Sequence, residues 1–292
     1  MTERRRLVRV PASSANLGPG YDVLAAALSM HLELEVTETG EFGVDAGGTA
    51  VPEDRTNLCV RAFESLHAAD GLRFEIRSEI PVASGLGASA AAIVAGLMAA
   101  EHLYELALER EELLARAVEL EGHPDNVAAA IHGGFVICSR HDGTLSAARF
   151  DPPEGVEAVI VVPSEAVPTA EARRAMPDEI PLADAIANVS AASLLVLGVQ
   201  RSDLTLIERG LTDRVHQPRR AHLYPRSVEL VDQARELGAI GATISGAGPS
   251  VLVWTFWQST GKVVEALRAR VDGWAEVHRC PFSPLGADVP EL

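Results

Sequence analysis

The chain has 292 residues, of which 47% are hydrophobic, and a formal net charge of −16 at pH 7. This length is enough for two packed domains, and because no run of about 18 uncharged apolar residues occurs, we expect no membrane span. The negative charge argues against sequence-independent binding of nucleic acid, which needs a basic face to displace counterions from phosphates.

The N-terminal segment MTERRRLVRVPASS is basic, but it has neither the apolar stretch nor the cleavage site of a secretory signal. The chain has three cysteines, Cys59, Cys138 and Cys280, which are widely spaced and lie in apolar surroundings. We therefore expect buried free thiols in a cytoplasmic protein, and neither a disulfide framework nor a metal site.

The first half of the chain mixes predicted strands and helices. Residues 31–40 (HLELEVTETG) and 73–78 (RFEIRS) alternate apolar and charged side chains, which is typical of half-buried strands. Residues 110–122 (REELLARAVELEG) place leucine and alanine at helical spacing and end in a glycine, so they predict a helix. The apolar run 133–139 (GGFVICS) predicts another strand.

The second half is predicted to be an α+β layer of helices over antiparallel strands. The acidic, proline-rich segment 150–157 (FDPPEGVE) precedes it and predicts a boundary between two domains, 1–152 and 153–292. The predicted strands are 156–163, 241–246 and 251–256, and the predicted helices are 182–199, 224–238 and 260–271.

Residues 10–22, VPASSANLGPGYD, form the first segment that carries candidate chemistry. They predict the end of a strand, a polar turn, and a Gly-Pro-Gly stop before a helix that begins at Tyr21. A loop with a helix cap would explain any one of these residues. Asn16 and Asp22 together suggest more, because both can place polar groups in the same pocket.

Residues 80–96, IPVASGLGASAAAIVAG, place glycine-rich backbone directly before a helix-forming run. Gly85 and Gly87 lack the Cβ atoms that would block a close approach, and the run after them is rich in alanine. Unpaired N–H groups at the positive end of a helix bind anions, so this segment predicts a phosphate site. It is not a P-loop, because Lys262 is the only lysine in the chain.

Residues 119–135, ELEGHPDNVAAAIHGGF, crowd Glu121, His123, Asp125 and Asn126 into six positions before an apolar helical run. Asp125 alone would explain a helix cap, and a cap needs only one such residue. A carboxylate such as Glu121 is a hard oxygen ligand of the kind that Mg²⁺ takes. Ser89, at the start of the preceding predicted helix, is either a helix cap or a second oxygen ligand.

Residues 241–254, GATISGAGPSVLVW, place a loop of small residues between two predicted strands. A hairpin turn explains part of this composition. A simple hairpin rarely needs a loop of this kind, so the segment is a second candidate for a functional loop.

Three of these segments resemble, in the right order and across nearly the whole chain, the signature motifs of the GHMP kinase family: PASSANLGPGYD, PVASGLGASAAA and SGAGPS. The resemblance implies an α+β, two-domain fold. Its N-terminal domain would be like domain 2 of ribosomal protein S5, and its C-terminal domain would be ferredoxin-like. The resemblance also implies phosphorylation of a small alcohol with ATP and Mg²⁺.

Carried over from the family, the second and third motifs would bind the phosphates of ATP, and Ser89 and Glu121 would hold Mg²⁺. The residues implied at the phosphates are Pro81, Val82, Ala83, Ser84, Gly85, Leu86, Gly87, Ala88, Ser89, Ser245, Gly246, Ala247 and Gly248.

The substrate implied by the resemblance is L-homoserine, phosphorylated on the way to threonine. The turn SSANLGPG lacks the lysine that is usual in the sugar and mevalonate branches, and EGHPDN looks like the version of the homoserine branch. The residues implied at the polar end of the substrate are Asn16, Asp22, His123 and Asn126, with Arg173 and Arg220 on the carboxylate.

Several alternatives stay open at this stage. Related kinases use an aspartate as the base where this chain has the amide Asn126, so Asp22 is the candidate base, and direct positioning without a base is the rival. The chain could instead be a GHMP kinase for another small alcohol, or a catalytically silent paralogue that binds ATP or an amino acid. A homodimer is common in the family and is compatible with this sequence.

Overall fold

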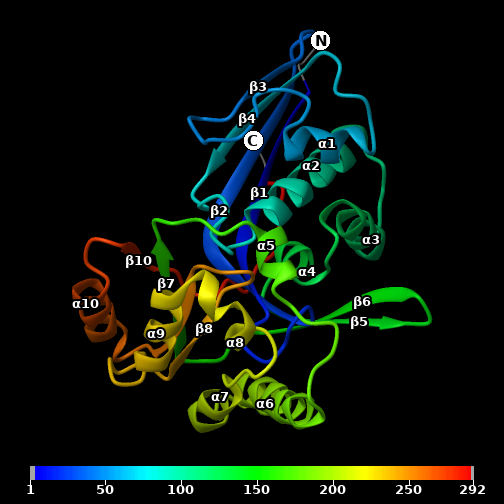
Figure 1. Ribbon diagram of the computed structural model, residues 1–292. Coiled ribbons are helices and arrows are strands. Elements are labelled where there is room, and N and C mark those ends of the chain that lie inside the picture. Colours follow the sequence, from blue (N-terminus) through cyan, green and yellow to red (C-terminus); the bar gives the residue numbers. More distant parts are fainter. Residues whose placement is uncertain (1–3, 291–292) are drawn as a thin grey trace.

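The computed structural model describes residues 4–290, which form two β-sheets with helices packed against them (Figure 1). In the first sheet the strand order is β3-β4-β2-β5-β6, and β1 pairs with β2. All of its pairings are antiparallel except the one between β3 and β4. Its strands are β1 (Arg5–Ala15), β2 (Leu24–Glu38), β3 (Gly43–Asp45), β4 (Leu72–Ser78), β5 (Phe135–His141) and β6 (Thr144–Phe150).

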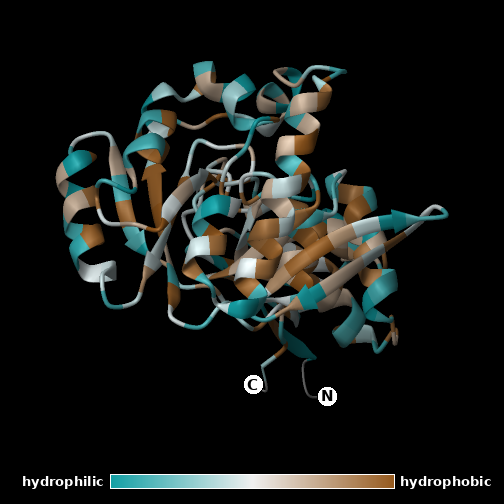
Figure 2. Ribbon diagram, turned by 90° about the horizontal axis from the view of Figure 1, so that it is seen from below, coloured by the Kyte–Doolittle hydropathy of each residue, from teal (hydrophilic) through white to brown (hydrophobic). Residues whose placement is uncertain are grey.

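Four helices accompany this sheet: α1 (Leu58–Glu64), α2 (Ala88–Tyr104), α3 (Arg110–Glu121) and α4 (Asp125–His132). Helices α2 and α4 pack on β1 and β2, and α1 packs on α2. At Gly96 in α2, a Cβ atom would lie 2.1 Å from the carbonyl oxygen of Cys59 in α1, so this glycine allows the two helices to approach closely. Hydrophobic segments concentrate where the helices face the sheets (Figure 2).

The second sheet has the antiparallel order β10-β7-β9-β8, with strands β7 (Val156–Pro163), β8 (Gly241–Ile244), β9 (Val251–Phe256) and β10 (Ala275–Arg279). Helices separate β7 from β8, a short loop joins β8 to β9, and one helix leads to β10, which is the ferredoxin-like arrangement. The helices are α5 (Thr169–Arg174), α6 (Leu182–Arg201), α7 (Leu204–Gly210), α8 (Gln217–Arg220), the 3₁₀ turn η1 (Ala221–Leu223), α9 (Pro225–Gln233) and α10 (Thr260–Arg270).

The chain passes from the first sheet to the second between Phe150 and Val156, next to the predicted boundary at 152 and 153. The last described residues then return to the first sheet, where Phe282 bridges to Leu28 and Asp288 bridges to Arg9. Division into domains 1–152 and 153–292 therefore stays a prediction, because residues after β10 pack on the first half.

The helix predicted to begin at Tyr21 is wrong. The chain turns at Leu17–Pro19 and Tyr21–Val23 and then enters β2 at Leu24. The alanine-rich start of β2 favours a helix locally, but it lies between β1 and β5 and hydrogen-bonds to both. Tertiary pairing thus overrides local propensity. Asp22, with φ of +56°, also excludes a right-handed helix at this point.

The three cysteines are free and buried, as expected from their apolar surroundings. Burial raises the pKa of the Cys59 and Cys138 thiols to about 12, and burial likewise raises the pKa of Cys280. Thiols of this kind are inert near neutral pH.

One helix among residues 4–290, α6, is long and apolar enough to cross a membrane by length and composition. Core helices of globular proteins meet the same test. Here Ala191, Leu195 and Val199 are buried, and Gly198 and Gly210 bring α6 close to α7. The opposite face of α6 exposes Leu182, Ile186 and Val189.

Candidate active site

A cavity of about 440 Å³ lies where the two halves of the chain meet. It is lined from the turn after β1, the loop before α2, the ends of α3 and α4, helices α5 and α8, and the loop after β8. All four polar or glycine-rich segments of the sequence therefore converge on one site. The six residues predicted at the substrate line it together: Asn16, Asp22, His123, Asn126, Arg173 and Arg220.

The predicted phosphate segment forms a loop that ends at the N-terminus of α2. Gly87 precedes this helix in the left-handed conformation, and no side chain caps the first turn. The lining residues from the predicted phosphate set are Val82, Ala83, Ser84, Gly85, Gly87, Ala88, Ser89, Gly246 and Ala247. The other four, Pro81, Leu86, Ser245 and Gly248, do not line the cavity.

From the sequence, Gly85 and Gly87 are predicted to leave space for an anion. In the structure, other parts of the chain approach both glycines closely instead. A Cβ on Gly85 would lie 2.3 Å from the carbonyl oxygen of Ser245, and a Cβ on Gly87 would lie 2.1 Å from the Ser13 hydroxyl. The space is therefore taken by the first and third motifs. Ser245 reinforces the junction, since its hydroxyl lies 2.8 Å from both the Ser14 hydroxyl and the Gly85 carbonyl oxygen.

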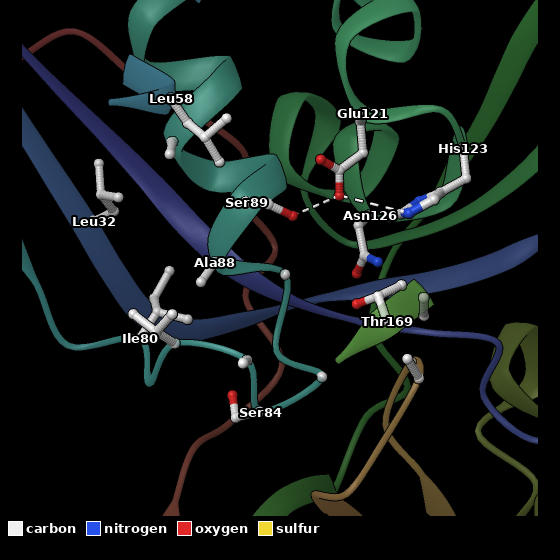
Figure 3. Close-up of a pocket in the computed structure, with 18 of the residues that line it drawn as sticks. Leu32, Leu58, Ile80, Ser84, Ala88, Ser89, Glu121, His123, Asn126 and Thr169 are labelled. Carbon is white, nitrogen blue, oxygen red and sulfur yellow. Dashed lines mark hydrogen bonds and ion pairs between the residues drawn. The ribbon is translucent and has the colours of Figure 1, made fainter. Parts of the chain in front are cut away.

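Ser89 and Glu121 face each other at the start of α2 and the end of α3 (Figure 3). The Ser89 hydroxyl donates to Glu121 Oε1 over 2.6 Å. Burial raises the pKa of the Glu121 carboxyl. No cluster of three or more His, Cys, Asp or Glu side chains able to hold a metal occurs within residues 4–290. The pair thus offers two oxygen donors, which suits a cation that takes its other ligands from phosphate and water.

His123 lies beside this pair (Figure 3). Its Nε2 is 3.7 Å from Glu121 Oε1, and its Nδ1 is 3.3 Å from Asp125 Oδ1. Burial disfavours the charged imidazole, but the Asp125 and Glu121 carboxylates outweigh burial and raise the pKa of His123.

Asn126, in the first turn of α4, accepts a hydrogen bond from the Ser13 hydroxyl over 2.9 Å. Thr169, the first residue of α5, faces the same space from the opposite wall (Figure 3). Thr169 is not among the residues predicted from the sequence, although its position four residues before Arg173 places both on one face of a helix.

The turn after β1 is held by the second half of the chain. The Asn16 amide donates to the Gly246 carbonyl oxygen over 2.8 Å, and its Oδ1 accepts the backbone N–H of Asp22 over 3.0 Å. Arg173 donates to both oxygens of Asp22, over 2.8 and 3.2 Å. The residues expected to bind the two charges of an amino acid are therefore paired with each other.

Arg220 is 2% exposed and reaches the same space from α8. Its Nε donates to the Ala172 carbonyl oxygen over 2.8 Å, and its Nη2 donates to the Tyr21 hydroxyl over 3.2 Å. Among the described residues it forms no ion pair with a carboxylate.

The other end of the cavity is apolar, and none of the residues predicted from the sequence belongs to it. Leu32 lines it from β2, Ile80 lines it from the loop after β4, and Leu58 lines it from α1 (Figure 3). Buried apolar positions on strands and helices look the same in a sequence whether they fill a core or face a cavity, so no sequence signal separates them.

Two family models match the chain, the GHMP kinases N terminal domain over residues 57–134 and the GHMP kinases C terminal model over residues 194–273. Homoserine kinase of Thermus thermophilus is 40% identical over 265 residues, which cover 89% of this chain and 90% of that one. The chain belongs to the GHMP kinase family. Homoserine kinase of Moorella thermoacetica is 38% identical to this kinase over 256 residues, which cover 85% of this chain and 86% of that one.

A crystal structure of homoserine kinase from Cytophaga hutchinsonii has a TM-score of 0.88 to this kinase at 29% identity, covering 99% of this chain and 98% of that one. The family and the two-domain α+β fold predicted from the three motifs are thereby confirmed.

We expect Gly85→Ala to destabilise this kinase more than Gly40→Ala, which is a matched control. Both glycines have φ above +80°, but a Cβ on Gly40 meets nothing within 4 Å. Gly40→Ala should cost roughly 1 kcal/mol of unfolding free energy from backbone strain alone, whereas Gly85→Ala should cost at least about 2 kcal/mol more because it forces two motifs apart. Urea denaturation measures both. Equal losses would show that the contact with Ser245 is not tight.

Proposed function

We propose that this kinase transfers the γ-phosphoryl group of ATP to the side-chain hydroxyl of L-homoserine, giving O-phospho-L-homoserine and ADP in threonine biosynthesis. The relatives from Thermus thermophilus and Moorella thermoacetica are homoserine kinases. The observation that carries the proposal is the buried Arg220 guanidinium, which faces the cavity with no carboxylate partner within residues 4–290. A buried cation without an anion is costly, and the carboxylate of an amino acid would supply that anion.

The ion pair of Asp22 and Arg173 fits the rest of an amino acid. The ammonium of L-homoserine would bind Asp22, and its carboxylate would lie between Arg173 and Arg220. One zwitterion thus satisfies both members of a pair that otherwise bind each other over 2.8 and 3.2 Å. Planar guanidinium groups bind carboxylates with two hydrogen bonds, which favours arginine over lysine here.

The remaining cavity suits ATP. Its apolar end, at Leu32, Leu58 and Ile80, would hold the adenine ring. The phosphates would then reach the N-terminus of α2, where free N–H groups and the helix dipole favour anions. The polar and apolar ends meet beside Ser89, so both substrates can react there.

Ser89 and Glu121 fit a magnesium ion. They offer a hydroxyl and a carboxylate 2.6 Å apart, and the carboxylate is buried with no cation among the described side chains in ion-pair contact except the neighbouring His123. Bound there, Mg²⁺ would neutralise charge on the β- and γ-phosphates.

In the proposed reaction the homoserine hydroxyl oxygen bonds to the γ-phosphorus, the bond to the β,γ-bridging oxygen breaks, and ADP leaves with that electron pair. The hydroxyl proton passes to an oxygen of the transferred phosphoryl group unless a protein base accepts it. Asp22 was the candidate base, but both of its oxygens accept from Arg173, and we assign it to the substrate ammonium. Asn126 is an amide and would orient the hydroxyl. We therefore favour positioning without a protein base.

We further propose that the kinase is a cytoplasmic homodimer joined through α6. Within residues 4–290, six of the ten exposed large hydrophobic side chains lie on or beside this helix: Val23, Ile180, Leu182, Ile186, Val189 and Leu197. Four of them, Val23, Ile180, Val189 and Leu197, line an apolar groove of about 710 Å³. Because the chain carries a charge of −16, other faces repel a second copy, whereas this patch is almost uncharged.

Arg220→Leu should lower kcat/KM for L-homoserine by about 10²-fold, or roughly 2.7 kcal/mol, because it removes the partner of the carboxylate. The same variant should lose less than about threefold on 3-aminopropan-1-ol, which lacks that carboxylate. ADP release measures both rates. Arg226→Leu, at an exposed arginine outside the cavity, is the control.

Wild-type protein should turn over with L-homoserine and not with mevalonate or without an acceptor. Turnover on mevalonate would identify another small-molecule kinase. ATP binding without turnover on any acceptor would identify a silent paralogue. Equal losses of Arg220→Leu on both amino alcohols would place Arg220 outside the carboxylate site.

Glu121→Gln should raise the Mg²⁺ concentration for half-maximal ADP release at least tenfold, because an amide is a weaker ligand than a carboxylate. Glu119→Gln, at an exposed position two residues earlier on α3, should behave as wild type. A Glu121 variant with unchanged Mg²⁺ dependence would remove this residue from the metal site.

Light scattering should give the wild type twice the mass of one chain. Ile186→Asp, at a side chain 61% exposed on α6, should give the monomer mass. Leu285→Asp changes a side chain that is even more exposed, 73%, but lies outside the patch, and this variant should leave the dimer intact. A monomeric wild type, or a dimeric Ile186→Asp, would refute this interface.

A further inference from the structure

We propose that His216 is a positioning residue for the amino-acid substrate. It would hold the turn 16–22 so that Tyr21 and Asp22 present themselves to the substrate, although His216 itself does not line the cavity. The inference rests on the proposed function, and it adds a residue that none of the sequence motifs contains.

His216 contacts the turn through a hydrogen bond and through ring stacking. Its ring is fully buried, and its Nε2 donates to the carbonyl oxygen of Gly18 over 2.9 Å. Its ring also stacks on Tyr21, with the centroids 5.6 Å apart and the planes 30° from parallel. Burial lowers the pKa of His216, so the ring is a neutral imidazole near neutral pH, with its proton on Nε2.

His216 is itself fixed by Asp213, whose side chain is also fully buried. The Asp213 carboxylate accepts the backbone N–H groups of Val215, His216 and Gln217 over 2.8, 3.0 and 2.6 Å. It also accepts from the amide of Asn188 on α6, over 2.9 Å. The same amide lies 3.2 Å from the carbonyl oxygen of Pro19, so the group around Asp213 binds two consecutive carbonyls of the turn.

The turn has little room to shift. Gly18 has φ of +84°, and a Cβ there would lie 2.9 Å from both the Leu211 carbonyl oxygen and the Thr243 methyl group. The backbone at Gly18 therefore packs directly against the second half of the chain. The hydrogen bond from His216 fixes the orientation of the Gly18 carbonyl group there.

The turn carries contacts to both proposed carboxylate-binding arginines. The Tyr21 hydroxyl accepts from Arg220, whose guanidinium carbon lies 5.1 Å from the Tyr21 ring centroid. The next residue, Asp22, binds Arg173 with both oxygens. Movement of the turn thus displaces Asp22 and loosens Arg173 and Arg220 together. Within residues 4–290, His216 makes no hydrogen bond or stacking contact with the loop 81–89, so the effect should be specific to the amino acid.

Two variants separate the two contacts. His216→Phe keeps a ring against Tyr21 and removes the donor to Gly18. His216→Gln keeps a donor at a similar reach and removes the stacked ring. His222→Phe is the matched control, because His222 is exposed and lies outside the cavity.

Steady-state kinetics should show His216→Phe with a KM for L-homoserine at least tenfold higher and a KM for ATP within twofold of wild type. In His216→Gln, the rise in the logarithm of the KM for L-homoserine should be at most half of that in His216→Phe. His222→Phe should have the KM values of the wild type. Calorimetric titration with L-homoserine should give the same ratio of affinities. A general loss of structure would raise both KM values.

An unchanged KM for L-homoserine in His216→Phe, or equal rises in both KM values, would overturn the inference. If that variant does not fold, Asn188→Ala decides in the same assay, since it releases the turn at Pro19 instead. Wild-type protein without turnover on L-homoserine would refute the proposed function and this inference with it. Wild-type turnover with unchanged KM in the variants would refute the inference alone.

Discussion

The structure depends on the hydrogen bonds and the ion pair that the second half of the chain makes with the turn that follows β1. From Ala15 to Asp22, backbone or side-chain groups of the turn bind partners more than 150 residues away, among them Gly246, His216 and Arg173. The first sheet alone would leave these polar groups without partners, which is costly when they are buried. The substrate site therefore exists only where the two halves meet.

The same constraint explains the small residues of the three motifs. The phosphate loop, the turn after β1 and the loop after β8 approach within van der Waals contact, and Gly85 and Gly87 leave space for Ser245 and Ser13. Because Gly85 and Gly87 carry no side chains at the junction, backbone N–H groups at the start of α2 stay free to face the cavity. Glycine-rich segments, which in a sequence suggest a flexible backbone, thus allow close packing here.

Charge is arranged along the cavity in a way that matches the two proposed substrates. The guanidinium groups of Arg173 on α5 and Arg220 on α8 lie at one end. The carboxylate of Glu121 lies near the middle, and apolar side chains line the other end. The net charge of −16 belongs to the whole chain and not to this cavity, so it says little about which anion the site binds. Local electrostatics decide recognition here.

The sequence by itself determined the family, through the order of three motifs. The six residues that it predicted at the substrate, from the turn after β1, the polar cluster around Glu121 and two arginines, do line one cavity. Local composition could not determine that Leu24 starts a strand, that Gly85 makes room for Ser245, or that Leu32 and Leu58 face a cavity. It also gave no sign that His216 holds Gly18. Those outcomes depend on contacts between residues far apart in the chain, and only the tertiary structure brings such residues together.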